Sequence, residues 1–270
     1  MNFLSTDLAY LSDQLINHHN LKVGKKIYQL IEIEFYHKSS SHNDTFVHGD
    51  QEQLQNATWY YHRMRGGYKE GTYKGMDITF GPNNEHGGLL VRCIKDLSTG
   101  NLIEGPCLVV QEILKEHKLD KVSDLAKLGD ADTRNVLTNK YHSLVALQQP
   151  RTDSLLSSPR VGLKFNSRMA ESEFDPKFAY VLKPYRIIHG PSQPKIKKQA
   201  TTLGIKLKVQ SAKTKFDANQ VDSTQATKEQ LDKFRKSIIS QSKDKSLKWN
   251  KDFYYKLYQY CFIMDPNWVV

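Results

Sequence analysis

Two glutamates separated by one residue, Glu32 and Glu34, are the side chains of this sequence best suited to acid–base chemistry. They lie in the stretch QLIEIEFYHK, whose apolar and polar residues alternate as in a β-strand, so both carboxylates point to the same face. Two neighbouring carboxylates favour protonation of one of them, which suits a general acid or base. The alternative is a pair of exposed glutamates on the solvent face of a strand, which is common in proteins.

Three further polar side chains could take part in such a site. Asp44 and His48 lie four residues apart in the loop after the strand, where they could orient a water molecule or a substrate. Arg92 interrupts the apolar run GGLLVRCI. A charge within a buried run needs a partner or a cavity, because burying it alone is costly.

Several common kinds of functional site are absent from the sequence. It has no GxSxG, no P-loop and no GxGxxG motif, which argues against serine hydrolases, P-loop hydrolases and dinucleotide-dependent oxidoreductases. Neither a Cys cluster nor HExxH is present, so we expect no metal site. The three cysteines, Cys93, Cys107 and Cys261, are far apart and fit buried thiols in a reducing compartment.

The elements that would position these residues are, in chain order, a helix, three strands, two helices and two strands. Apolar residues at helical spacing predict a helix over 3–16, and Pro106 predicts the first turn of another. A short helix is expected over 122–127. The predicted strands cover 25–36, 73–80, 87–94, 160–165 and 185–189.

The composition changes near Pro191. The segment 183–258 holds 18 Lys and Arg against 6 Asp and Glu, which accounts for the net charge of +10 and leaves the rest slightly acidic. We therefore expect a domain over 1–190 and an extension over 191–270, made of a linker, a basic amphipathic helix and an aromatic tail that packs on the domain or on a partner. Such a charge surplus favours a polyanion, nucleic acid first and anionic membrane second, although a solubilising tail would also explain it.

Seven short motifs follow one another in a fixed order over residues 5–190. They are Glu32, Glu34 and Tyr36; Asp44 and His48; Leu89-Leu90-Val91-Arg92-Cys93; GPCLVVQEI from Gly105; Asp124-Leu125-Ala126; Arg160-Val161-Gly162; and Lys183-Pro184-Tyr185-Arg186. In this order they resemble the 3-methyladenine DNA glycosylase family, also called alkyladenine or methylpurine glycosylases.

The resemblance implies an α+β fold, a single compact domain around a curved antiparallel sheet with flanking helices. It implies that Glu34 activates a water molecule for attack on the anomeric carbon of a flipped nucleotide, with Arg92 beside it. Tyr36 and His48 would form the base pocket, and Glu32 and Asp44 would support it. No metal or other cofactor is implied, and the product would be an abasic site in an intact strand.

The sequence departs from the family pattern in the stretch GGYKEGTYKGMDITFG. Lys74 stands where the family has a tyrosine that fills the gap left by the flipped base, and Tyr73 could replace that tyrosine. Thr79 replaces an asparagine of the base pocket, and Asp77 adds a carboxylate that the family lacks. We expect phosphate contacts from Lys74 and, in the extension, from Lys195, Lys197 and Lys198.

These observations predict an N-glycosidase that removes a modified or unusual purine from nucleic acid, with DNA as the expected partner, single-stranded or distorted DNA included. The first alternative is a catalytically inactive nucleic-acid-binding protein with the same fold, and a weaker one is binding of a protein or a membrane surface by the aromatic tail. The sequence shows neither a signal peptide nor a stretch of about 18–20 apolar residues, so we expect an intracellular monomer, nuclear or cytoplasmic, with no membrane partner.

Overall fold

The computed structural model describes residues 1–82, 84–128, 134–158, 160, 163, 180, 183–192 and 210–211. Two compact units make up the chain: Met1–Leu155 with Arg186–Ser192, and Leu156–Tyr185 with Gln193–Val270. The predicted helix and aromatic tail of the extension lie outside the described residues, as do Lys195, Lys197 and Lys198. The candidate site lies in the first unit.

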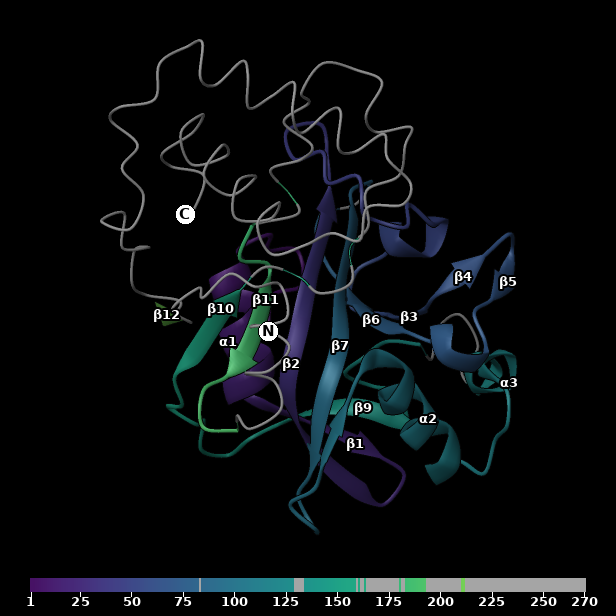
Figure 1. Ribbon diagram of the computed structural model, residues 1–270, viewed down its shortest axis with the longest axis vertical. Helices are drawn as coiled ribbons and strands as arrows, with labels where there is room; N and C mark the ends of the chain where they lie inside the picture. The colour runs from purple at the N-terminus through teal and green to yellow at the C-terminus, as the bar shows by residue number, and fades with distance from the viewer. Residues whose placement is uncertain are drawn as a thin grey trace, which may run out of the picture. The chain divides into compact units, whose positions relative to one another are not determined.

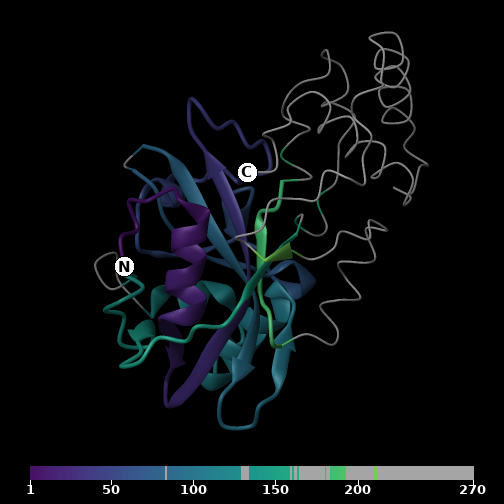
Figure 2. The ribbon, with the colours of Figure 1, turned by 90° about the vertical axis from the view of Figure 1, so that its left-hand side faces the viewer.

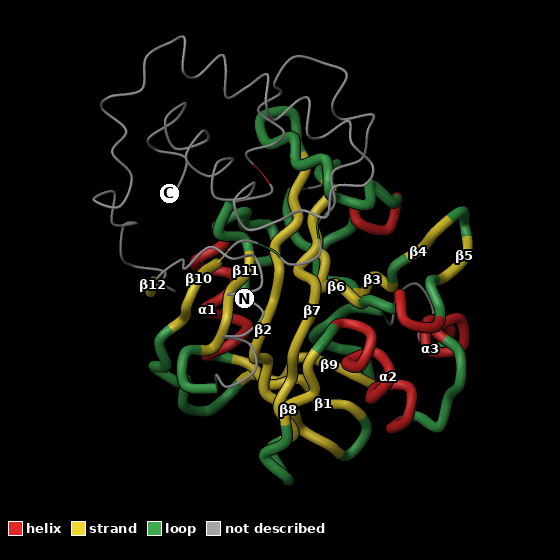
Figure 3. The backbone as a smooth tube through the Cα atoms, viewed as in Figure 1, coloured by secondary structure: helices red, strands yellow, loops and turns green. Residues whose placement is uncertain are grey.

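Two long antiparallel strands, β2 (Lys26–Lys38) and β7 (His86–Asp96), form the centre of the first unit (Figures 1 and 3). Alternation of apolar and polar residues gives β2 two faces, one apolar and one polar. Ile33 and Phe35 lie on the apolar face and are buried. The other face carries Glu32, Glu34 and Tyr36.

The neighbouring strands extend this pair on both sides in the order β11-β2-β7-β6-β3, and every pairing is antiparallel. The bounds are β11 Arg186–His189, β6 Met76–Thr79 and β3 Trp59–Tyr61. In addition β1 (His19–Val23) pairs with β2 and with β9 (His142–Ala146), and β8 (Leu102–Glu104) pairs with β7. A hairpin of β4 (Arg63–Met64) and β5 (Gly67–Tyr68) stands apart from this sheet.

Helices pack on the sheet through apolar side chains. Helix α1 (Leu8–Asn17) begins where Asp7 accepts hydrogen bonds from two backbone amides, and it packs on β1 and β2 (Figure 2). Helix α2 (Pro106–Glu116) starts at a proline and packs on β7 and β8. The short helix α3 (Val122–Lys127) follows it. The predicted α+β fold around a curved antiparallel sheet with flanking helices is confirmed.

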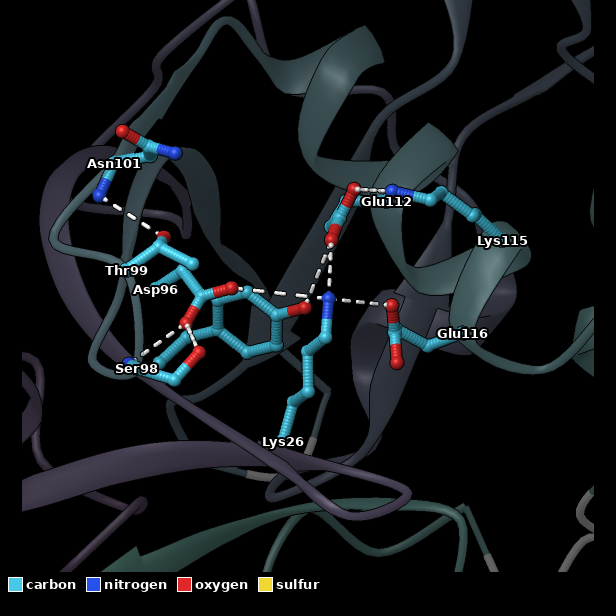
Figure 4. Close-up of polar contacts among 9 residues, drawn as sticks. Lys26, Asp96, Ser98, Thr99, Asn101, Glu112, Lys115 and Glu116 are labelled. Atoms are coloured by element: carbon cyan, nitrogen blue, oxygen red, sulfur yellow. Dashed lines mark hydrogen bonds and ion pairs between the residues drawn. The ribbon is translucent and has the colours of Figure 1, made fainter.

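A cluster of charged groups joins α2 to the sheet (Figure 4). Lys26 Nζ lies 2.7 Å from a Glu116 oxygen and 3.3 Å from Glu112 Oε1, and the hydroxyl of Tyr28 donates to that same Glu112 oxygen at 3.0 Å. Asp96 Oδ2 is 3.7 Å from Lys26 Nζ. Because the cluster links β2, β7 and α2, it fixes the helix over one end of the central strand pair.

Two predicted boundaries were wrong and have local causes. The first helix begins at Leu8 instead of Phe3, because Asp7 is extended (φ −73°, ψ 107°) and caps it. The predicted strand 73–80 begins only at Met76, because Gly71–Tyr73 forms a 3₁₀ turn (η2) that opens with Gly71 at φ +62°. The described ranges contain no helix long and apolar enough to cross a lipid bilayer.

The second unit has few described residues. Strand β10 (Leu155–Ser158), which lies in this unit from Leu156 onward, pairs with β12 (Gln210–Ser211), with Leu156 opposite Ser211. Most of the predicted strand 160–165, including the Val161-Gly162 part of one motif, lies outside the described residues.

Candidate active site

Glu34 and Arg92 meet on the polar face of the central strand pair. Arg92 Nη1 lies 3.2 Å from Glu34 Oε2, and the hydroxyl of Tyr36 donates to the same oxygen at 2.9 Å. Arg92 Nε donates to Glu32 Oε1 at 2.9 Å. The β2–β7 ladder is irregular here, where neither Ile31 nor Arg92 has a paired residue opposite it. Ladder irregularities of this kind often re-aim a side chain toward a functional site.

Arg186, at the start of β11, completes this group from the other side. It pairs across the sheet with Glu34, and its Nε lies 2.6 Å from Glu32 Oε1. The residue is fully buried, and no described residue hydrogen-bonds its Nη1 or Nη2. Buried polar groups in proteins nearly always have a partner, so these two nitrogens are donors that a water molecule or a ligand could satisfy.

The charges of this four-residue group balance, with two carboxylates against two guanidinium groups. Glu32 and Glu34 are buried, and the Arg92 side chain is only 11% exposed. Burial alone would lower the pKa of Arg92, but attraction to Glu34 and then to Glu32 outweighs it and raises that pKa above its ordinary value. Such a buried group is costly to desolvate, and removing one member leaves an unpaired charge.

A second polar cluster lies on the same face, two strands away. The pairings Glu34–Leu90, Leu90–Asp77 and Asp77–Tyr60 form one row across β2, β7, β6 and β3, so Glu34 and Asp77 project from the same face. Asp77 Oδ1 lies 2.7 Å from His62 Nε2. Asp77 Oδ2 accepts from Gln53 Nε2 at 3.4 Å.

Two glycines leave room for this cluster. A Cβ on Gly88 would lie 2.6 Å from Asp77 Oδ2, and a Cβ on Gly75 would lie 2.4 Å from His62 Nδ1. Real Cβ atoms do not approach other atoms this closely. The positions of Asp77 and His62 therefore depend on glycine at 75 and at 88.

His48 belongs to the second cluster. Its ring lies 4.3 Å from that of His62, with the planes nearly perpendicular. Lys69 Nζ is 3.0 Å from His48 Nε2, and the Tyr60 hydroxyl is 3.3 Å from Nδ1. A lysine ammonium can only donate, so His48 accepts at Nε2 and carries its proton at Nδ1. Desolvation, and then repulsion from His62, lower the pKa of His48 below its ordinary value.

The chain shares 33% identity over 207 residues with a protein of Acanthamoeba polyphaga mimivirus described as uncharacterized protein L759. The alignment covers 72% of this chain and 89% of the viral protein. The chain belongs to the family of that viral protein. No family model matches the sequence. The description of the mimivirus protein names no activity.

The structure brings together some of the predicted site residues and separates others. Glu32, Glu34, Tyr36 and Arg92 form one contact group, whereas His48 contacts Tyr60, Lys69 and His62 of the second cluster. Asp44 is buried in the loop and accepts from the Phe46 amide at 3.1 Å. Its predicted supporting role and the pocket role of His48 stay predictions.

Three predicted residues come from GGYKEGTYKGMDITFG, the stretch that departs from the family pattern. Thr79 is fully buried, and its hydroxyl lies 2.8 Å from that of Thr58. This hydroxyl pair joins β6 to the residue just before β3. Tyr73 is 75% exposed at the η2 turn. Lys74 is buried and donates to the Gly71 carbonyl at 2.7 Å. A phosphate contact by Lys74 would require this bond to open.

Sequence reasoning missed Arg186 and His62 as site residues. Arg186 ends the Lys183-Pro184-Tyr185-Arg186 motif, which was a usable signal, whereas nothing in the local pattern around His62 pointed to Asp77. Among the described residues no group of three or more His, Cys, Asp or Glu is placed to hold a metal ion.

Proposed function

We propose that this protein is an N-glycosidase that removes a modified or unusual purine from nucleic acid, with Glu34 as the general base. The observation that carries the proposal is the contact group of Glu34 with Arg92 and Tyr36, at the positions where the glycosylase motifs require it. The order of the seven motifs supports the same conclusion.

In the proposed reaction Glu34 takes a proton from a water molecule, whose oxygen forms a bond to C1′ of the sugar. The bond from C1′ to the base nitrogen breaks, and its electron pair leaves with the base. The carboxylate also stabilises positive charge that develops on the sugar ring. Arg92 fixes the carboxylate through its 3.2 Å contact and, with the buried Arg186, offers donors to the attacking oxygen or the substrate.

The substrate must leave the base stack before Glu34 can reach its sugar. The basic segment 183–258 would hold the strand through phosphate contacts, which bind strongly and read no sequence. With Lys74 turned into the protein and Tyr73 exposed, Tyr73 is the side chain of this stretch that is free to fill the gap. Nucleic acid that is already single-stranded or distorted would need no such residue.

The test is single-turnover base release by wild type and by Glu34→Gln. The substrates are single- and double-stranded oligonucleotides, each carrying one modified purine, and the released bases are identified by mass. We expect the variant to lose about 10²–10⁴-fold in rate and to keep its affinity for the oligonucleotide. Gln keeps the size of Glu34 and one oxygen that can accept from Arg92 and Tyr36, so a loss of affinity would indicate a structural role. Equal rates would overturn the proposal.

The catalytically inactive nucleic-acid-binding protein remains the second candidate, favoured by the charge surplus of 183–258. It predicts binding that weakens steeply with salt and no abasic product from any substrate of the panel. The base-release measurement on the wild type separates the two candidates.

A further inference from the structure

We propose that Ser192, His189 and Asp153 form a second catalytic site, in which Ser192 is the nucleophile of acyl transfer from a carboxylic ester. This inference goes beyond the proposed function and uses none of its catalytic residues. The sequence has no GxSxG motif to announce such a site. The same three roles nevertheless occur in proteins with different chain orders and different surrounding motifs.

The first support is the geometry of the three side chains. The Ser192 hydroxyl lies 2.7 Å from His189 Nδ1, and an Asp153 carboxylate oxygen lies 2.8 Å from His189 Nε2. Both distances fall within the range of about 2.6–3.2 Å in which a nucleophile contacts its base and a base contacts the group that orients it. The serine is thus placed as the nucleophile, the histidine as the base and the aspartate as the orienting group.

The second support is the position of the proton on the imidazole. An ionised carboxylate can only accept, so His189 Nε2, next to Asp153, carries a proton. In the neutral ring Nδ1 is then an acceptor, and the Ser192 hydroxyl donates to it. This tautomer can take the serine proton. Compared with the serine proteases, the two ring nitrogens have exchanged roles, which leaves the chemistry intact because each nitrogen can accept or donate.

The third support is the exposure of the three residues. The His189 side chain is only 6% exposed, so the surrounding protein holds its ring, whereas the Asp153 side chain is 36% exposed. Ser192 is half-buried, and part of its surface therefore meets solvent. A substrate can reach the nucleophile while the base stays fixed.

Backbone contacts bring these residues together across 36 positions of the chain. The Gly190 amide donates to the Ser154 carbonyl at 2.7 Å, and these two residues directly follow the histidine and the aspartate. A Cβ on residue 190 would lie 2.6 Å from that carbonyl oxygen, so the close approach depends on glycine. Asn17 Nδ2 donates to the Asp153 carbonyl at 3.1 Å and ties the segment to α1.

The proposed reaction has two steps. In the first, Ser192 Oγ forms a bond to the carbonyl carbon of the ester, and its proton moves to His189 Nδ1. The bond from that carbon to the alcohol oxygen breaks, and its electron pair leaves with the alcohol, which takes the proton from Nδ1. In the second step a water molecule gives a proton to Nδ1 and attacks the acyl carbon, and the serine oxygen leaves and takes this proton. The products are an acid and an alcohol, and the three residues return to their starting state.

The test uses a fluorophosphonate probe, whose phosphorus forms a bond to an activated serine oxygen as fluoride leaves. The full chain is treated with the probe, the labelled residue is located by mass spectrometry, and hydrolysis of p-nitrophenyl acetate is measured in parallel. We expect label on Ser192 and none in Ser192→Ala. His189→Gln should lower both rates by about 10²-fold or more, because the serine loses its base. Asp153→Asn should also lower them, because its amide favours the wrong tautomer of the ring.

Ser98 is the matched control. It is exposed, its hydroxyl donates to an Asp96 oxygen at 2.6 Å, and no histidine of the described ranges is bonded to it. It should stay unlabelled, and Ser98→Ala should leave both rates unchanged. No label on Ser192, equal label on the two serines, or equal rates in wild type and His189→Gln would overturn the second site. Thermal unfolding identifies a histidine variant that misfolds, and Ser192→Ala, which removes a single oxygen, then decides. Base release by Glu34 is measured separately with oligonucleotides, so either proposal can fail without the other.

Discussion

The Nε atom of Arg186 lies 2.6 Å from Oε1 of Glu32, although the two residues are 154 positions apart in the chain. Arg92 donates to the same oxygen at 2.9 Å. One buried carboxylate oxygen therefore joins two arginines from two strands, and next to it lies Glu34, the proposed base. By accepting this hydrogen bond, Glu32 helps to hold the Arg92 side chain in place.

Arg186→Met should lower the free energy of unfolding by about 3–5 kcal/mol, because it removes one partner from a buried ionic group. The double change with Glu32→Gln should lower the free energy of unfolding by less than the sum of the two single changes. The difference should be about 1 kcal/mol or more. Urea unfolding of the four proteins measures this. Asp124→Asn, which breaks an exposed pair with Lys127, is the control and should change stability by about 0.5 kcal/mol or less. Additive effects would contradict the shared role of Glu32.

Tyr28→Phe should destabilise the protein by about 1 kcal/mol, because it removes the hydrogen bond to Glu112 and keeps the buried ring. The loss should appear first as faster amide hydrogen exchange in α2, the helix that this bond joins to the sheet. Tyr10→Phe, which removes a hydroxyl contact to the exposed Asn2 amide, serves as the control. If the α2 amides exchanged at the same rate in Tyr28→Phe as in the control, the cluster would not hold the helix.

Gly88→Ala should lower the stability of the protein, because the new Cβ would lie 2.6 Å from Asp77 Oδ2 and 3.1 Å from Gln53 Nε2. We expect a loss of about 1–3 kcal/mol, typical of overpacking. Gly67→Ala, whose Cβ would meet only the Met64 carbonyl at 3.9 Å, is the matched control in a strand. Thermal unfolding checks the difference, and equal effects would mean that Asp77 moves aside without cost.

Burial, and then the neighbouring His117, lower the pKa of His142 from 6.5 to about 3. The unfolded chain therefore takes up a proton at this residue below about pH 6.5 while the folded chain does not. This contribution to stability is complete above pH 6.5 and is lost as the pH falls toward 3. Between pH 7 and pH 5 the loss from this residue is about 2 kcal/mol.

His142→Gln should remove that share of the pH dependence, and Gln can still bond to the Tyr61 hydroxyl, which lies 2.6 Å from His142 Nε2. The measurement is urea unfolding at pH 7 and pH 5. A variant with the same slope as wild type would show that other groups dominate acid unfolding.

Local patterns predicted the elements whose signals are local. The alternation around Ile33 and Phe35 and the proline at 106 placed β2 and α2 nearly as observed, and the short helix 122–127 has the predicted bounds. Strands β1 and β9 were not predicted. Both are short, and β1 gains its hydrogen bonds from β2, which follows it directly, and from β9, which comes far later in the chain and outside any short window.

The contacts of the candidate site are likewise of two kinds, those within one strand and those that depend on which strands pair. Glu34 and Tyr36 share one strand, so their position on one face followed from a spacing of two. The contact of Arg92 with Glu34 was expected only from the resemblance, and its contact with Glu32 was not expected. The contacts of Arg186 and His62 depend on which strands lie side by side. The local spacing of residues does not encode the pairing of strands that are far apart in the sequence.

The division of the first unit along the chain has a consequence for protein synthesis. A ribosome that has completed residues 1–155 has made β2 and β7, but Arg186–His189, the strand that pairs with the other edge of β2, comes only after a segment assigned to the second unit. At about 5–20 residues per second this edge stays open for some seconds, with Glu32 lacking one of its two arginines. During this interval the nascent chain exposes an unpaired strand edge, which is the kind of surface that chaperones cover and that other chains can join.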